Sequence, residues 1–125
     1  MATKMSLAAF ERGYVECALW CGAWDGEERC HRVVMSDLTD DALQMLVRQA
    51  ANFEHANRDL LDVANAEGRD DEYLGHDFWL TRNRHGAGFW DGRLSADLGA
   101  QLTERAHDYG ECDLHLNANG QVDLV

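Results

Sequence analysis

Four side chains capable of proton transfer lie close together in the sequence: His76, Asp77, His85 and Asp91. Imidazole and carboxylate groups can act together as general acid and base, or hold a metal ion that assists hydrolysis. The chain contains neither a G-x-S-x-G nor an H-E-x-x-H motif, so no specific reaction follows from these residues alone. A small hydrolase or nuclease centred on them is therefore one alternative for the function.

A second group of potential ligands contains sulfur. Cys17 and Cys21 are four positions apart, which would place both on one face of a helix, and Cys30 and His31 follow them. Together these residues could supply the four ligands of a tetrahedral zinc site. However, the two cysteines also fit the apolar face of a helix as small core residues, and the spacing of the four is not typical of zinc sites. Zinc is the weaker interpretation, and we predict no cofactor.

Acidic residues dominate positions 37–75, where ten acidic and three basic residues give a net charge of −7, against −12 for the whole chain. Such a charge disfavours general binding to nucleic acid, because affinity for phosphates depends on basic contacts, and it favours basic partners. A rod of carboxylates could compete for a groove that normally holds a nucleic-acid backbone. The carboxylates predicted to contact the partner are Asp40, Asp41, Glu54, Asp59, Asp62, Glu67, Asp70, Asp71 and Glu72.

Residues 76–93 differ from the rest of the chain, since three basic and two acidic residues leave them slightly positive. Basic residues interleaved with aromatic ones are typical of single-strand binding, through phosphate pairing and base stacking. Given the overall charge, we instead expect the aromatic rings to belong to the core, with arginine stems packed over them and no direct nucleic-acid binding. The residues in question are Arg82, Arg84, His85 and Arg93 with Trp79, Phe89 and Trp90.

The first half of the chain has the apolar spacing of helices. Apolar residues three and four apart predict a helix over 6–21 that ends near Gly22. A long second helix is predicted to begin near Ser36 or Thr39, both good N-caps, and to end at Gly68. Asn57 interrupts its apolar stripe.

The second half alternates in a way that favours strands. The alternation over Phe78–Asn83 and the turn at Gly86–Gly88 predict a β-hairpin over 76–91. A third helix follows, capped by Ser95 and closed by Gly110, and Asn119-Gly120 predicts a second hairpin. We therefore predict a single α+β domain over 1–125, with two N-terminal helices and a mainly antiparallel, four-stranded sheet covered by helices.

The run His76-Asp77-Phe78-Trp79-Leu80-Thr81-Arg82-Asn83, followed by His85-Gly86-Ala87-Gly88-Phe89-Trp90-Asp91, resembles a motif of small uncharacterised proteins of bacteriophage and prophage genomes. The resemblance extends over about the last fifty residues, through Leu98, Leu102 and Tyr109-Gly110-Glu111 to the terminal strands. It implies no established activity and no residue roles. It implies a context in which small proteins bind and block host machinery, including restriction enzymes and CRISPR complexes.

The favoured function is a non-enzymatic protein that binds a host protein or nucleoprotein complex with a basic surface. Inhibition of a defence system, by nucleic-acid mimicry on the acidic helix, is its most specific form. The hydrolase or nuclease and a structural or accessory phage component remain alternatives. No apolar run reaches the roughly 20 residues of a membrane span, and no secretion signal is evident at the N-terminus, so we expect the host cytoplasm as the location.

Overall fold

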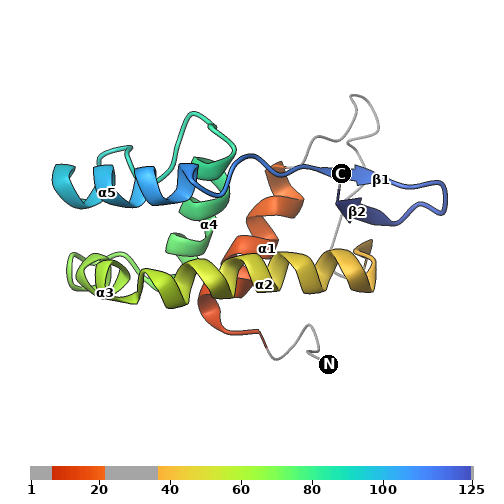
Figure 1. The fold of residues 1–125 in the computed structure, drawn as a ribbon, viewed down its shortest axis with the longest axis horizontal. Helices are drawn as coiled ribbons and strands as arrows, with labels where there is room; N and C mark the ends of the chain where they lie inside the picture. Colours follow the sequence, from red (N-terminus) through yellow and green to blue (C-terminus); the bar gives the residue numbers. More distant parts are fainter. Residues whose placement is uncertain (1–6, 22–36, 125) are drawn as a thin grey trace.

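The computed structural model describes residues 7–21 and 37–124, and in this part of the chain it is mostly helical (Figure 1). In Figure 1, α2 and α5 run along opposite sides, and α1 and α4 cross between them. The helices are α1 (Ala9–Cys21), α2 (Asp40–Ala56), α3 (Arg58–Ala66), α4 (Asp71–Arg82) and α5 (Ala96–His107), and the strands are β1 (Leu114–Leu116) and β2 (Val122–Leu124).

Several predicted elements are present. Helix α1 buries Phe10 and Tyr14, as the apolar spacing predicts. Helix α2 begins after Thr39, whose hydroxyl accepts a hydrogen bond from the backbone N–H of Ala42 at 3.1 Å. Because that side chain satisfies a backbone donor that has no partner within the helix, it fixes where α2 starts.

The C-terminal hairpin is also confirmed. β1 pairs antiparallel with β2, with Leu114 opposite Leu124 and Leu116 opposite Val122. The turn contains Gly120 at a φ of 78°, in the left-handed region that glycine tolerates best. On the other edge of β2, the N–H of Thr39 donates to the carbonyl of Val122 at 2.9 Å. This bond ties the hairpin to the start of α2.

The predicted long helix is two helices that meet at Asn57. This residue is buried, ends α2 and precedes α3. Its side-chain amide donates to the carbonyl of Phe53 at 3.0 Å, and its side-chain oxygen accepts from Arg105 of α5 at 2.6 Å. The polar residue that interrupts the apolar stripe is thus the point at which the chain changes direction, and α3 is seen nearly end-on in Figure 1 while α2 lies across the view.

The prediction of a four-stranded sheet covered by helices is wrong. The described residues form one two-stranded sheet. Residues 71–82 form helix α4, although most of them were expected to precede or form the first strand of a hairpin. Asp70 caps this helix by accepting from the N–H of Tyr73 at 3.1 Å. Alternation failed as a signal because α4 is buried on most sides, including at Phe78, Trp79, Thr81 and Arg82, so its sequence lacks the one apolar stripe of a surface helix.

Two glycines allow α4 to lie directly against α1. A Cβ at Gly75 would lie 2.2 Å from the carbonyl oxygen of Phe10, and one at Gly13 would lie 2.1 Å from that of Glu72. Real side chains do not tolerate such distances, so backbone meets backbone here. Gly13 and Gly75 therefore set the spacing of the helix pair.

The segment after α4 folds back along it. The hydroxyl of Thr81 accepts from the N–H of Phe89 at 3.0 Å, and Gly88 sits where a Cβ would be 2.2 Å from that same hydroxyl. Phe89 is thereby buried, and its ring centroid lies 5.9 Å from that of Phe53. The tight turn predicted at Gly86–Gly88 is wrong: Gly86 and Gly88 lie at bends, and the turns fall at Asn83–Arg84, directly after the helix, and at Phe89–Trp90. None of the described helices is both long and apolar enough to span a membrane.

Candidate functional site

The proposed acid–base group is split by the fold. His76 and Asp77 are on α4, where Asp77 is buried and paired with Arg69 through two hydrogen bonds of 3.0 Å. Burial raises the pKa of Asp77, and the hydrogen bonds and charge of Arg69 oppose that rise. An aspartate held by both oxygens is a structural partner for Arg69, and it is poorly placed to take a proton from a substrate.

Asp91 lies near Asp77, and its charge helps to raise the pKa of Asp77, whereas His85 lies apart. One carboxylate oxygen of Asp91 accepts from the N–H of Gly88 at 3.3 Å, and the other is buried without a partner among the described residues. His85 is exposed just beyond the end of α4. Within the described ranges, no contact joins His85 to the other three residues, so the arrangement gives no support to a four-residue catalytic group.

The predicted zinc ligands fall largely outside the described residues. Cys30 and His31 lie in the undescribed range 22–36, and the side chain of Cys21 is not described. Cys17 is buried on α1, as the core interpretation of this residue predicts.

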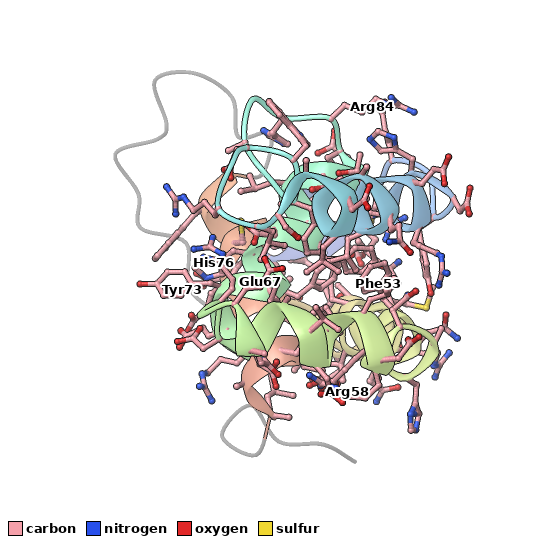
Figure 2. All side chains as sticks on the ribbon, turned by 90° about the vertical axis from the view of Figure 1, so that its left-hand side faces the viewer. Phe53, Arg58, Glu67, Tyr73, His76 and Arg84 are labelled. Carbon is pink, nitrogen blue, oxygen red and sulfur yellow. The ribbon has the colours of Figure 1, made fainter. Side chains whose placement is uncertain are left out.

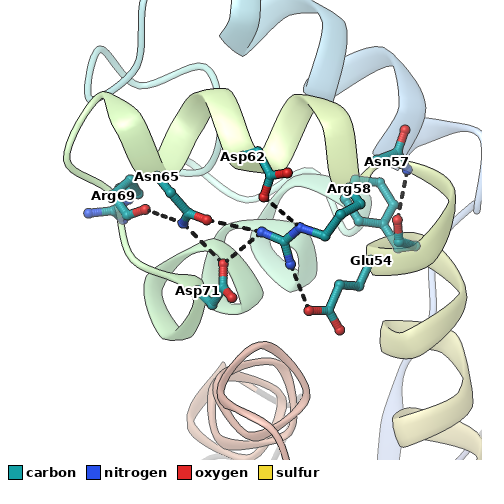
Figure 3. Close-up of polar contacts among 8 residues, drawn as sticks. Glu54, Asn57, Arg58, Asp62, Asn65, Arg69 and Asp71 are labelled. Carbon is teal, nitrogen blue, oxygen red and sulfur yellow. Dashed lines mark hydrogen bonds and ion pairs between the residues drawn. The ribbon is translucent and has the colours of Figure 1, made fainter.

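Three of the predicted acidic residues surround one cation. The guanidinium of Arg58 hydrogen-bonds Glu54 at 2.9 Å, Asp62 at 2.9 Å and Asp71 at 3.2 Å (Figure 3). Asn65 completes the cluster by accepting from Arg58 and donating to Asp71. Arg58 thus joins the ends of α2 and α3 to the start of α4, and it partly neutralises these carboxylates.

Three further acidic residues also have internal partners. Glu67 accepts two hydrogen bonds from Ser95, Asp70 caps α4, and Glu72 lies 3.8 Å from Arg12. The other three predicted contact residues, Asp40, Asp41 and Asp59, are exposed, and no ion pair is found for them in the part of the chain that the structure describes. The acidic surface is therefore discontinuous.

The basic and aromatic side chains of the locally basic segment, residues 76–93, divide into a buried group and an exposed group. Trp79, Phe89 and Arg82 are buried, which agrees with the expectation that these rings belong to the core. Trp90 is about half exposed, and Arg84, His85 and Arg93 are exposed. Stacking of bases between Trp79 and Phe89 is thus excluded by their burial.

Another group of side chains converges where α1 and α4 cross. One ligand atom each from Glu16, Glu72 and His76 lies within 4.8 Å of the other two. The ring of Trp20 lies 5.5 Å from that of His76, and the ring of Tyr73 lies 5.8 Å from it, both edge-on. We call these five residues the α1–α4 face. Figure 2 shows Tyr73 and His76 side by side, with Tyr73 extending outward from the molecule.

The α1–α4 face combines exposed rings with close carboxylates. Trp20 is 70% exposed and Tyr73 is 50% exposed. The pKa of Glu16 is raised, first by burial and then by the neighbouring charge of Glu72 and the hydrogen bond between the two carboxyls. Nε2 of His76 is buried and has no hydrogen-bond partner within the described ranges. The face can therefore offer aromatic surface, negative charge and an imidazole nitrogen to one ligand.

The spacing of these residues in the sequence indicates that they share helix sides, but the prediction of a strand in this region prevented its use. Glu16 and Trp20 are four positions apart, as are Glu72 and His76, and residues at that spacing share one side of a helix. The signal could be used only if residues 71–82 were recognised as a helix. Which two helix sides meet is decided by the glycine contact between α1 and α4, and no local pattern reveals it.

Comparisons of the chain with protein-family models, with curated proteins and with solved structures return no match.

Proposed function

We propose that this protein acts by binding a macromolecular partner with a basic surface, and that the α1–α4 face makes the central contact. The observation that carries the proposal is the pair of exposed rings, Trp20 and Tyr73, that both contact His76. Large aromatic side chains are the residues most enriched at the centres of protein–protein interfaces. Leaving Trp20 exposed has no evident benefit to folding, so its position favours a role in contact.

Charge indicates the chemistry of the partner. The net charge is −12, and Glu16 and Glu72 lie beside the rings. A guanidinium can stack on an aromatic face while it pairs with a carboxylate. The protein already does this within itself, because the guanidinium of Arg69 lies 4.8 Å from the centre of the Tyr73 ring and pairs with Asp77. We therefore propose an arginine-rich surface on the partner.

The phage-like motif favours a more specific version, in which the partner is a host defence complex that handles nucleic acid. Such complexes hold their substrates in basic grooves, which an acidic protein can approach quickly and over long range. Asp40, Asp41 and Asp59 would contribute charge at the margin of the contact. Pairing of the other acidic residues with Arg58, Arg12, Ser95 and the α4 backbone makes the aromatic face the first surface to test.

Calorimetric titration with an arginine-rich peptide tests the chemistry of the contact. Binding should weaken as salt is added, and Trp20→Ala should lower the affinity about tenfold, the size of a partly desolvated cation–π contact. Trp90→Ala is the matched control, since Trp90 is 51% exposed and lies outside the α1–α4 face. Equal affinity of the two variants would contradict the proposal.

The defence version needs a separate test in cells. Phage plating is compared on a host with an active restriction or CRISPR system, with and without this protein. Expression should raise the efficiency of plating, the double variant Trp20→Ala/Tyr73→Ala should not, and Trp90→Ala should behave as the unaltered protein. If none of the proteins changes plating on any such host, the defence version is wrong, while binding to another basic partner is still decided by the titration.

A further inference from the structure

The donor atoms of the α1–α4 face form a compact set on two different helices. Glu16 comes from α1, and Glu72 and His76 come from successive turns of α4. Their ligand atoms lie within 4.8 Å of one another. Gly13 and Gly75 bring the backbones of α1 and α4 into contact. The positions from which the three side chains extend are therefore fixed by rigid elements.

One atom of this set, Nε2 of His76, lacks a hydrogen-bond partner among the described residues. It is shielded from solvent, and a buried polar atom normally has such a partner. The carboxyl groups of Glu16 and Glu72 also face each other. The pKa of Glu16 is raised first by burial, then by the charge of Glu72 and the hydrogen bond between the two carboxyls. A cation bound between the three side chains would remove the repulsion, and could recruit a ring nitrogen of His76 as a ligand.

We propose that Glu16, Glu72 and His76 bind a divalent transition-metal ion, with Zn²⁺ as the best match. Zinc accepts imidazole nitrogen and carboxylate oxygen, and three protein ligands leave a fourth position for water or for a group of a partner. Mg²⁺ and Ca²⁺ prefer sites made of oxygen alone, so the imidazole disfavours them. The rings of Trp20 and Tyr73 flank His76 and would limit its rotation.

Among the described residues, Arg12 is the cation that pairs with one of the proposed ligands and opposes this occupancy. It lies 3.8 Å from Glu72, and its side chain is 41% exposed. A contact that long and that exposed contributes little to stability, so Arg12 can move aside when a metal ion binds. Arg12→Ala should accordingly raise the affinity for the metal.

The metal site goes beyond the proposed function and does not depend on it, because the metal alone is the probe. The full chain is titrated calorimetrically with ZnCl₂ and, separately, with MgCl₂. One equivalent of Zn²⁺ should bind, with an affinity at least tenfold above that for Mg²⁺, and should raise the melting temperature by stabilising the folded state. Binding of Mg²⁺ as tight as that of Zn²⁺ would overturn the proposal.

Matched variants separate this site from other ligands in the chain. His76→Gln and Glu16→Gln should each lower the affinity for Zn²⁺ at least tenfold, whereas His55→Gln, an exposed histidine of α2, should not change it. Circular dichroism shows whether each variant is folded. If His76→Gln does not fold, Glu16→Gln provides the test. Titration with Co²⁺ detects thiolate ligands by their intense charge-transfer absorption. Unchanged affinity in the folded variants, or thiolate absorption on binding, would overturn the assignment.

Discussion

The guanidinium of Arg82 donates to the hydroxyl of Tyr14 at 2.9 Å, in the interior of the protein. The same guanidinium bonds Gln49 at 3.1 Å and the carbonyls of Tyr109 and Gly110 at 2.9 and 2.8 Å. Arg82 therefore joins α1, α2 and α4 to the connection between α5 and β1. No carboxylate pairs with it among the described residues, so neutral oxygen atoms replace the water lost by a buried cation.

Replacing Arg82 should lower the free energy of unfolding more than replacing a surface arginine does. Arg82→Met fills a similar volume but leaves the Tyr14 hydroxyl and two carbonyls with fewer partners. We expect a loss of about 3 kcal/mol in the free energy of unfolding, measured with urea, because buried polar groups lose their hydrogen bonds. Arg93→Met, at an exposed position, should change it by less than about 0.5 kcal/mol. Similar losses in both variants would contradict the central role of Arg82.

Contact between α1 and α4 should fail when a methyl group is added at Gly75. Gly75→Ala places a Cβ 2.2 Å from the Phe10 carbonyl oxygen, and the helices must separate to admit it. The expected loss of stability is about 3 kcal/mol or more, at the upper end of overpacking. Gly86→Ala is the control, since nothing lies within 4 Å of the added atom and its backbone is not in the left-handed region. Equal stability of the two variants would contradict the direct backbone contact between α1 and α4.

Stability should fall with rising pH through the titration of Glu54. Its pKa is raised to about 7, first by burial and then by hydrogen bonding to, and repulsion from, Glu11. A carboxyl whose folded pKa exceeds its unfolded value favours the folded state below the unfolded value of 4.5, and that contribution is lost as pH rises through 7. Glu54→Gln should therefore be more stable than the unaltered protein at pH 8, by about 1 kcal/mol after solvent screening.

The measurement for Glu54 is urea unfolding at pH 5 and pH 8. Asp59→Asn, an exposed position on the next helix, corrects for the change in net charge. A gain for Glu54→Gln that is the same at both pH values would assign the effect to something other than the titration of Glu54.

The cluster around Arg58 should make a modest and salt-dependent contribution. Arg58→Ala removes bonds to Glu54, Asp62 and Asp71, and partly exposed pairs contribute about 0.5 kcal/mol each. We expect a loss of about 1.5 kcal/mol at low salt that shrinks in 1 M NaCl, where the Debye length is about 3 Å. Arg48→Ala changes the net charge equally at an exposed position of α2, so a loss of the same size there would show a general charge effect.

Arg84 should be replaceable with a gain in stability. It follows α4 with a φ of 58°, the left-handed conformation that glycine usually supplies after a helix. Its contact with Glu111 is 3.9 Å long and both side chains are mostly exposed. Removing this contact should therefore cost little stability. Arg84→Gly should raise the melting temperature by stabilising the protein by about 1 kcal/mol, whereas Arg84→Ala, which keeps the strain, should give no such gain.

The sequence alone determined the elements whose stabilising contacts are local. Thr39 accepts a bond three residues along the chain, and Asn119-Gly120 forms a turn between neighbouring strands. Helix α5 ends before Gly110 at a φ of 74°, as its position predicts. In each case the side chain or glycine and the backbone that it serves are a few residues apart, so composition and spacing suffice.

Only the tertiary structure decided the identity of residues 71–82 and the composition of the α1–α4 face. Alternation over Phe78–Asn83 favoured a strand, but Arg82 finds its partners 27 to 68 positions away, and Gly75 meets α1 across a gap of similar length. Such contacts outweigh local preference because they satisfy buried polar groups on several elements at once. Glu16 and His76 meet for the same reason: two helices whose backbones touch place side chains together that are sixty residues apart in the chain.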